Sequence, residues 1–154
     1  MSSLKKFAIK PDVLNALEPV FKKIKEGLVD LQSASIDICE NLGVTLNSDH
    51  APLFVSVTKA HDPVIRHNVG PALVIPVHGH AIQYVGLSAS TLVSEGVVTC
   101  VDSTTPIFFN DCSKFKYLVI PLATAVSGNP HGLLRLEMPT VKPKVLTCFI
   151  TLKK

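Results

Sequence analysis

The chain has 154 residues, of which 47% are hydrophobic and 18% are charged, and its formal net charge is +3. A composition this apolar excludes an intrinsically disordered chain. Lysine and arginine form no dense block, so we expect no nucleic-acid partner. The low charged fraction, against a usual value of about 25%, predicts that part of the surface is buried against copies of the same chain.

The N-terminal residues contain no apolar segment, and no apolar run reaches the roughly 20 residues that cross a bilayer. We therefore expect synthesis in the cytoplasm, with no signal peptide and no membrane span. The cysteines Cys39, Cys100, Cys112 and Cys148 form no CxxC pair, which favours free, mostly buried thiols over a metal or redox site.

Residues 11–43 form the only predicted helical stretch. The chain therefore divides into an N-terminal helical segment, residues 1–43, and a β domain, residues 44–154. Pro11 suits the start of a helix and Gly43 its end. Apolar residues recur at alternating spacings of three and four, the pattern of a coiled-coil seam. The seam runs through Leu14, Leu17, Phe21, Ile24, Leu28, Leu31, Ser35, Ile38 and Leu42.

Two interpretations of this seam stay open. The unbroken spacing favours a self-associating coil, in which the apolar seam residues make the oligomer contacts. The same spacing also occurs in an amphipathic helix that packs on its own β domain. Pro19 predicts a kink or a new helix start inside the stretch, and Gly27 costs about 1 kcal/mol relative to alanine.

After Gly43, short apolar runs alternate with turn residues, which predicts strands. Some runs, such as Tyr117–Ile120, are apolar on both faces and need cover from both sides. The spacing of the turns predicts an antiparallel β-sandwich or jelly roll of about seven or eight strands. The expected strands are Leu53–Thr58, Ala72–Val77, Ile82–Leu87, Val97–Asp102, Phe115–Leu122, Leu133–Met138 and Val145–Thr151.

His78 and His80 are the strongest candidates for chemistry. On a regular strand they would point to the same face and could supply two metal ligands, as in cupin-type barrels. Gln83 stands where the cupin pattern has a glutamate, and no second half of that pattern follows. Surface or turn histidines are the favoured interpretation, so we expect no bound metal or cofactor. No nucleophile motif and no phosphate-binding loop are present, so we expect no enzyme.

Phe108 and Phe109 lie between Pro106 and Asn110. The pair forms either a buried corner, which is the favoured interpretation, or the exposed tip of a loop. Exposed aromatic residues often anchor protein interfaces, so in the second case the pair would be a binding loop.

A helical stalk followed by a charge-poor β head resembles, in architecture, the trimeric fibre and spike proteins of viruses and phages. A local resemblance to small plant-virus coat proteins of the tymovirus kind covers Gly79–Leu87, Val97–Cys100 and Thr147–Thr151. The fibre resemblance implies a homotrimer, incorporated in a virion, whose loops bind a receptor protein or a glycan. Those loops would lie near residues 60–70, 103–113 and 125–131.

The leading hypothesis is therefore a non-enzymatic structural or attachment protein that forms a homo-oligomer. One alternative is a jelly-roll capsid protein, which would form large closed shells. The other alternative is a cupin-like metal-dependent enzyme that uses His78 and His80. The mixed residue types of the seam leave dimer and trimer both open.

Overall fold

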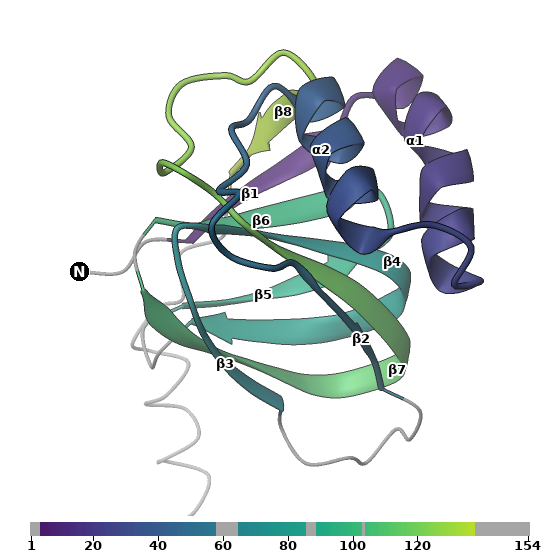
Figure 1. Cartoon of the computed structure of the whole chain (residues 1–154). Coiled ribbons are helices and arrows are strands. Elements are labelled where there is room, and N and C mark those ends of the chain that lie inside the picture. The colour runs from purple at the N-terminus through teal and green to yellow at the C-terminus, as the bar shows by residue number, and fades with distance from the viewer. Residues whose placement is uncertain (1–3, 58–64, 86–88, 103, 138–154) are drawn as a thin grey trace, which may run out of the picture.

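The computed structural model describes residues 4–57, 65–85, 89–102 and 104–137 (Figure 1). The described residues form a mainly β fold with two helices. In chain order the elements are β1 (Leu4–Ile9), α1 (Pro11–Lys25), α2 (Leu31–Leu42), β2 (Leu53–Ser56), β3 (Ile65–Val69), β4 (Ala72–Val85), β5 (Ala89–Ser94), β6 (Val97–Val101), β7 (Thr105–Pro121) and β8 (Leu133–Leu136).

The strands join in one antiparallel sheet with the order β2-β7-β4-β6-β1-β8, and β3 and β5 add to β7 and β4. The prediction of a mainly β fold is confirmed. The separate sheets of a sandwich are not found among the described residues, where one open sheet contains every strand.

The expected strands match in part. Those at Leu53–Thr58, Val97–Asp102 and Leu133–Met138 correspond to β2, β6 and β8. Two expected strands, Ala72–Val77 and Ile82–Leu87, are halves of the single strand β4, and Phe115–Leu122 is the second half of β7. Three strands, β1, β3 and β5, were not expected. The remaining expected strand, Val145–Thr151, lies outside the described residues.

The long strands β4 and β7 pair along most of their length, and their register shifts three times between Pro76 and Ile82. Gly79 and Lys114 have positive φ angles of 75° and 47° in this irregular stretch. Such bulges bend a sheet strongly. One half of the β4–β7 pair therefore continues into β6 and β2, while the other half continues into β5 and β3.

The two helices lie together on one face of the sheet, where they close the first hydrophobic core (Figure 1). Leu17 and Ile38 from the helices meet Phe7 and Leu73 from the strands there, and all four side chains are fully buried. Complete burial of side chains of this size contributes about 1.5–3 kcal/mol each. The helices therefore belong to the same folded unit as the sheet.

The predicted coiled coil is wrong. A strand, β1, precedes the helices and pairs with β6 and β8 in the sheet. The helical stretch is also broken at Gly27, whose φ is 69°, between α1 and α2. Most seam residues face the sheet of their own chain. Leu17, Phe21, Ile24, Ser35, Ile38 and Leu42 are buried, and Leu14 and Leu31 pack against the same core.

Two residues of the helical stretch, Leu28 and Pro19, differ from what a continuous seam predicts. Leu28 is 71% exposed, because it follows the break at Gly27 and leaves the buried stripe. Pro19 lies inside α1 and neither ends nor restarts that helix. The alternative interpretation, amphipathic helices packed on their own sheet, is the one that the structure confirms.

The ends of α2 are fixed by local and distant contacts. Asp30 caps the N-terminus, where its carboxylate accepts a hydrogen bond from the backbone N–H of Ser33 at 3.0 Å. Gly43 ends the helix in the left-handed conformation, with φ of 85°. The N–H of Gly132 then donates to the carbonyl oxygen of Leu42 at 3.1 Å, which ties the end of α2 to the segment before β8.

The second hydrophobic core lies on the other face of the sheet, between its bent halves. Phe109, Phe115 and Tyr117 form an aromatic cluster there, with ring centroids 4.4–5.2 Å apart. Two buried polar side chains face each other between β4 and β6, where the hydroxyl of Thr99 donates to Gln83 Oε1 at 2.7 Å.

Among the described helices, neither α1 nor α2 has the length and apolarity of a membrane span.

Candidate binding site

A pocket of about 310 Å³ lies at one end of the sheet, where three connections meet. These are the segment between α2 and β2, the turn between β3 and β4, and the residues before β7. The apolar lining comes from Ala51, Leu53, Val69, Gly70, Pro71, Ala72, Val119, Pro121 and Leu122, and the polar lining from Asn47, His50, Asn68 and Thr104. We refer to this hollow as the loop pocket.

The β3–β4 turn is held from both sides. The hydroxyl of Thr104 donates to the carbonyl oxygen of Gly70 at 3.2 Å, and the N–H of Leu122 donates to the carbonyl oxygen of Pro71 at 2.9 Å. Gly70 has φ of 135°, a conformation that residues with a Cβ rarely adopt. The turn therefore forms one wall of the loop pocket and is held by hydrogen bonds on both sides.

The opposite wall is the segment after α2, which runs beside the end of β7. Its backbone is anchored there, because the N–H of Asn47 donates to the carbonyl oxygen of Pro121 at 3.0 Å. The side chain of Asn47 accepts the N–H of Asp49 at 3.0 Å, which closes an Asx turn. This turn brings His50, an exposed residue, to the rim of the loop pocket.

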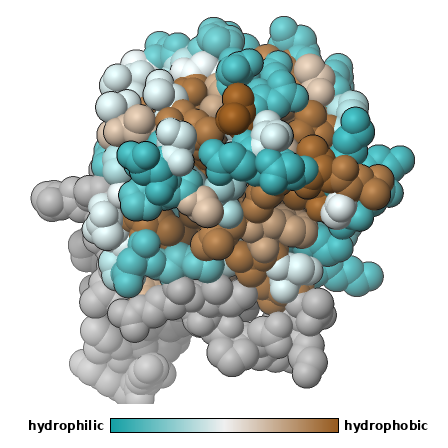
Figure 2. All heavy atoms as spheres, viewed as in Figure 1, coloured by the Kyte–Doolittle hydropathy of each residue, from teal (hydrophilic) through white to brown (hydrophobic). Residues whose placement is uncertain are grey.

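Among the residues that the structure describes, the lining of the loop pocket contains no Asp, Glu, Lys or Arg. The floor is apolar, and Leu53 remains 46% exposed there although it belongs to β2. Hydrogen-bonding groups come from two amides, one imidazole and one hydroxyl. A small apolar hollow with a few polar groups is typical of a site for an uncharged ligand. Figure 2 shows that hydrophobic residues reach the surface in several places on the face that it presents.

A second hollow, about 940 Å³, separates α1 from the β5–β6 hairpin. Leu14 and Phe21 from the helix and Val77 from β4 supply apolar surface, while Glu18, Lys22, Lys25 and Glu26 supply charges of both signs. Glu95 at the tip of the hairpin accepts the N–H of Gly79 at 3.3 Å. The charges largely cancel, so this groove shows no preference for an anion or a cation.

His78 and His80 do not form the expected pair. The register of β4 against β7 shifts on both sides of His78, and Gly79 between the histidines has φ of 75°. The alternation of side chains is broken there, so the two imidazoles lack the common face that a regular strand would give. His78 is half-buried opposite Lys116, and His80 is exposed opposite Ser113.

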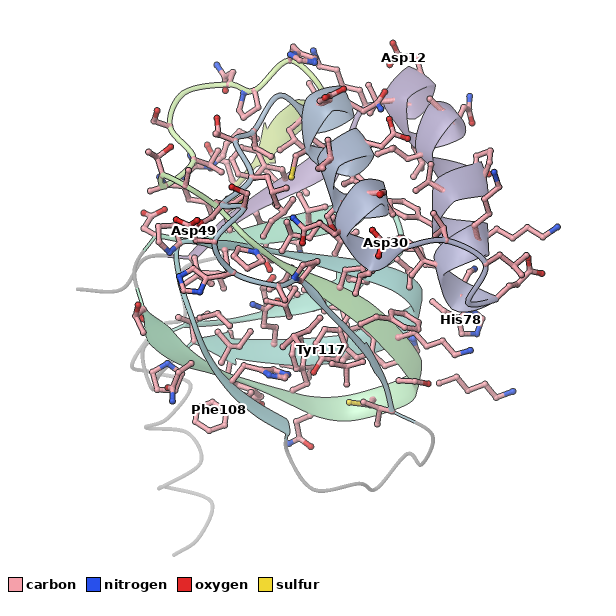
Figure 3. All side chains as sticks on the ribbon, in the orientation of Figure 1. Asp12, Asp30, Asp49, His78, Phe108 and Tyr117 are labelled. Carbon is pink, nitrogen blue, oxygen red and sulfur yellow. The ribbon has the colours of Figure 1, made fainter. Side chains whose placement is uncertain are left out.

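Phe108 and Phe109 do not form the tip of a loop. Both lie within β7, where Phe109 is buried in the second core and Phe108 is half-buried on the other side of the strand. Figure 3 shows Tyr117 within the curve of the sheet and Phe108 near its lower margin. The pair therefore lies in a strand and not in a loop, and Phe109 is buried, as the favoured interpretation expects.

Next to the aromatic cluster, His67 Nε2 and the hydroxyl of Tyr117 lie 2.6 Å apart. Burial lowers the pKa of His67 and raises the pKa of Tyr117, so both side chains stay neutral near pH 7. The rings of Phe109 and Phe115 pack on Tyr117, so this hydrogen bond belongs to the core. It therefore contributes to the stability of the fold.

Two of the described cysteines, Cys39 and Cys100, are buried and unsuited to nucleophilic chemistry. Burial raises the pKa of Cys39 to about 11 and that of Cys100 to about 12. Both thiols therefore stay protonated. Within the described part of the chain, no three His, Cys, Asp or Glu side chains lie close enough together to hold a metal ion.

The expected binding loops correspond to the loop pocket in part. Residues 68–70 and Thr104 line the pocket, whereas residues 105–113 belong to β7. In the third predicted loop, Val126 is buried in the first core, and its carbonyl oxygen accepts a hydrogen bond from Lys5 Nζ at 2.7 Å. The sequence prediction did not include Asn47 and His50, although Asn-Ser-Asp is a turn signal.

Comparisons of the chain with protein-family models, with curated proteins and with solved structures found no match.

Proposed function

We propose that this protein is a non-enzymatic interaction protein that binds an uncharged group of its partner in the loop pocket. The observation that carries the proposal is the described part of the lining, which joins an apolar floor to Asn47, His50, Asn68 and Thr104 without an acidic or strongly basic residue. A ring of a glycan or an uncharged side chain of a receptor protein offers matching apolar and hydrogen-bonding surface.

The walls of the loop pocket support a preformed site. Both connections are fixed by backbone hydrogen bonds to the end of β7, at Pro121 and Leu122. A preformed pocket loses little conformational entropy when a ligand binds, so even a small contact area contributes to affinity. An attachment role, with the pocket presented to a receptor, is consistent with this arrangement.

A second candidate function is a structural role in an assembly of identical chains, as in a capsid shell. It is favoured by the position of exposed leucines on strands that have one described neighbour each: Leu92 on β5 and Leu134 on β8. Strands of this kind offer both apolar surface and unpaired backbone groups to another chain. The two roles can coexist in one protein.

The binding role is tested by nuclear magnetic resonance on the isotope-labelled full chain. The probes are a panel of methyl glycosides and N-acetyl amino-acid amides with uncharged side chains. We expect at least one probe to shift the amide signals of Asn68, Val69 and Ala72 saturably. Loss of one hydrogen bond costs about 0.5–1.5 kcal/mol, so Asn68→Ala and His50→Ala should each weaken binding about two- to tenfold.

The matched control is Asn129→Ala, which removes an exposed amide that lines none of the described hollows. Binding by this variant should equal that of the unaltered protein. The proposal fails if no probe shifts the pocket amides, or if the three alanine variants bind a probe equally well.

A further inference from the structure

Four polar side chains from four strands share the face of the sheet that carries the second core. We refer to them as the polar ring, and they are Lys6 on β1, Thr91 on β5, Gln83 on β4 and Thr99 on β6. Register partners in neighbouring strands place their side chains on the same face. Thr99 is the partner of Lys6 and of Val74, while Gln83 is the partner of Thr91 and of Phe109. Val74 and Phe109 both belong to the second core.

Two hydrogen bonds join the members of the polar ring. The ammonium of Lys6 donates to the hydroxyl of Thr91 at 3.0 Å, and the hydroxyl of Thr99 donates to Gln83 Oε1 at 2.7 Å. Each bond links the β1–β6 pair to the β4–β5 pair, and the two register pairs complete the ring. Lys6 and Gln83 therefore lie at opposite corners of one small group of polar side chains.

The polar ring has more hydrogen-bond donors than acceptors. A lysine ammonium has three N–H groups and a glutamine amide has two. Within the described part of the chain, Thr91 is the acceptor for Lys6, and Gln83 Nε2 has no partner at all. The side chain of Gln83 is fully buried, so bulk solvent does not reach that nitrogen. Buried N–H groups in folded proteins nearly always have an acceptor, so this site lacks one.

The charge of Lys6 decides which kind of acceptor fits. A water molecule would satisfy the amide of Gln83, but it would leave the ammonium without a counter-charge. Lys6 is half-buried, so solvent screens its charge only in part. Among the described residues Lys6 forms no ion pair, whereas the neighbouring Lys5 pairs with Asp102. Hydrogen bonds from an ammonium to a carboxylate are roughly twice as strong as bonds between neutral groups, so an anion is favoured.

Space for an anion lies beside Lys6. Together with Leu4 and Leu136, this residue lines a hollow of about 410 Å³. The charged groups that also line the hollow are Lys5, Arg135 and Glu137, so the described lining has a net positive charge. A small anion therefore meets an attractive potential next to the polar ring.

We propose that the polar ring binds a carboxylate. One carboxylate oxygen accepts a hydrogen bond from the ammonium of Lys6 and the other accepts from Gln83 Nε2, while the hydroxyls of Thr91 and Thr99 hold these two donors in place. A free carboxylate ion and the carboxylate at the end of a peptide have the same chemistry here. The site shares no residue with the loop pocket, so the two sites bind independently.

The test is a nuclear magnetic resonance titration of the isotope-labelled full chain near neutral pH. The probes are sodium formate and sodium N-acetylglycinate, with the ionic strength held constant by sodium HEPES. We expect formate to shift the side-chain NH₂ signals of Gln83 saturably, while the loop-pocket amides of Asn68 and Val69 stay unchanged. An equal effect of N-acetylglycinate identifies the end of a peptide as an accepted ligand, and an effect of formate alone restricts the site to free ions.

Two variants separate anion binding from a general effect of salt. Lys6→Met removes the ammonium and keeps an unbranched side chain, so binding should weaken about tenfold or more. Thr91→Val keeps the lysine but removes the hydroxyl that holds it, and should weaken binding about two- to tenfold. The matched control, Lys23→Met, removes an exposed lysine of α1 that lines none of the described hollows and should bind formate normally.

Three results would overturn the proposal. The first is the absence of a saturable shift at Gln83 with either probe, which would assign the acceptor to an internal water molecule. The second is formate binding by Lys6→Met with the affinity of the unaltered protein. The third is an equal loss of binding in Lys6→Met and Lys23→Met, which would reduce the effect to the net charge of the protein.

Discussion

Truncation of a buried leucine of α1 and an exposed leucine of the connection between α1 and α2 measures how strongly the helical layer depends on the sheet. Leu17 on α1 is fully buried in the first core, whereas Leu28, in the same predicted seam, is 71% exposed. Leu17→Ala and Leu28→Ala remove the same atoms from the helical segment. The structure therefore predicts very different losses of stability for two residues that a coiled coil would treat alike.

For Leu17→Ala we expect a loss of about 2.7–5 kcal/mol in the free energy of unfolding, which is the range for a leucine in a rigid core. Phe7 and Leu73 of the same core are strand residues with fully buried side chains, so the upper half of the range is expected. Leu28→Ala should change the free energy by no more than about 0.5 kcal/mol, because most of the side chain already contacts water.

The assay is urea unfolding followed by circular dichroism, with all proteins at one fixed concentration. With a slope of about 1–3 kcal/mol per molar urea, the midpoint of Leu17→Ala should fall by at least about 1 M. The midpoint of Leu28→Ala should stay within the error of the unaltered protein. Equal losses for the two variants would refute the packing described for the helices, because only a seam shared between chains treats the two leucines alike.

Three further predictions concern the fold. Gly132→Ala should destabilise the protein by about 1–3 kcal/mol in urea unfolding, because a Cβ there would collide with the carbonyl oxygen of Asn41 at the end of α2. Thr99→Val should cost about 1–3 kcal/mol by leaving the buried amide of Gln83 without its hydrogen bond, and Gln83→Leu combined with Thr99→Val should restore most of that loss. Burial lowers the pKa of His67, so the unfolded chain binds a proton at a higher pH than the folded protein, and stability should fall as the pH drops below about 6.5. His67→Gln should flatten this pH dependence in urea midpoints measured at several pH values.

The helical segment shows which part of the architecture could be predicted from the sequence. Spacings of three and four at positions such as Leu17 and Ile38 identify helices with one apolar face. The same spacings do not state whether that face meets another chain or a sheet of its own chain. The strand β1 pairs with β6 and so completes the sheet on which the helices pack. A pairing between residues so far apart in sequence leaves no local signal.

The strand β1 was also hidden by its composition. Lys5 and Lys6 suggest a solvated segment, yet Lys5 pairs with Asp102 at 3.3 Å, and Lys6 donates to the hydroxyl of Thr91 at 3.0 Å. Similarly, the expected strands Ala72–Val77 and Ile82–Leu87 stop on either side of Gly79, whereas β4 continues through this stretch by means of bulges. In each case the partners that overrule the local preference are distant in sequence.

The loop pocket could not be assembled from the sequence for a related reason. Its residues come from four separated stretches, and only the folded ends of β4 and β7 bring Asn47 and Asn68 to the same hollow. The turn signals Asn-Ser-Asp and Gly-Pro mark two of these stretches as connections. They do not show that the two connections face each other.

The place of β1 between β6 and β8 has a consequence for synthesis of the protein. Leu4–Ile9 leaves the ribosome before any other described strand, yet its partners, Val97–Val101 and Leu133–Leu136, are made only after both helices and several other strands. A nascent chain that has produced both helices still lacks the strands on which they pack. Late pairing of this kind slows folding, and it exposes the apolar faces of α1 and α2 while the rest of the chain is being made.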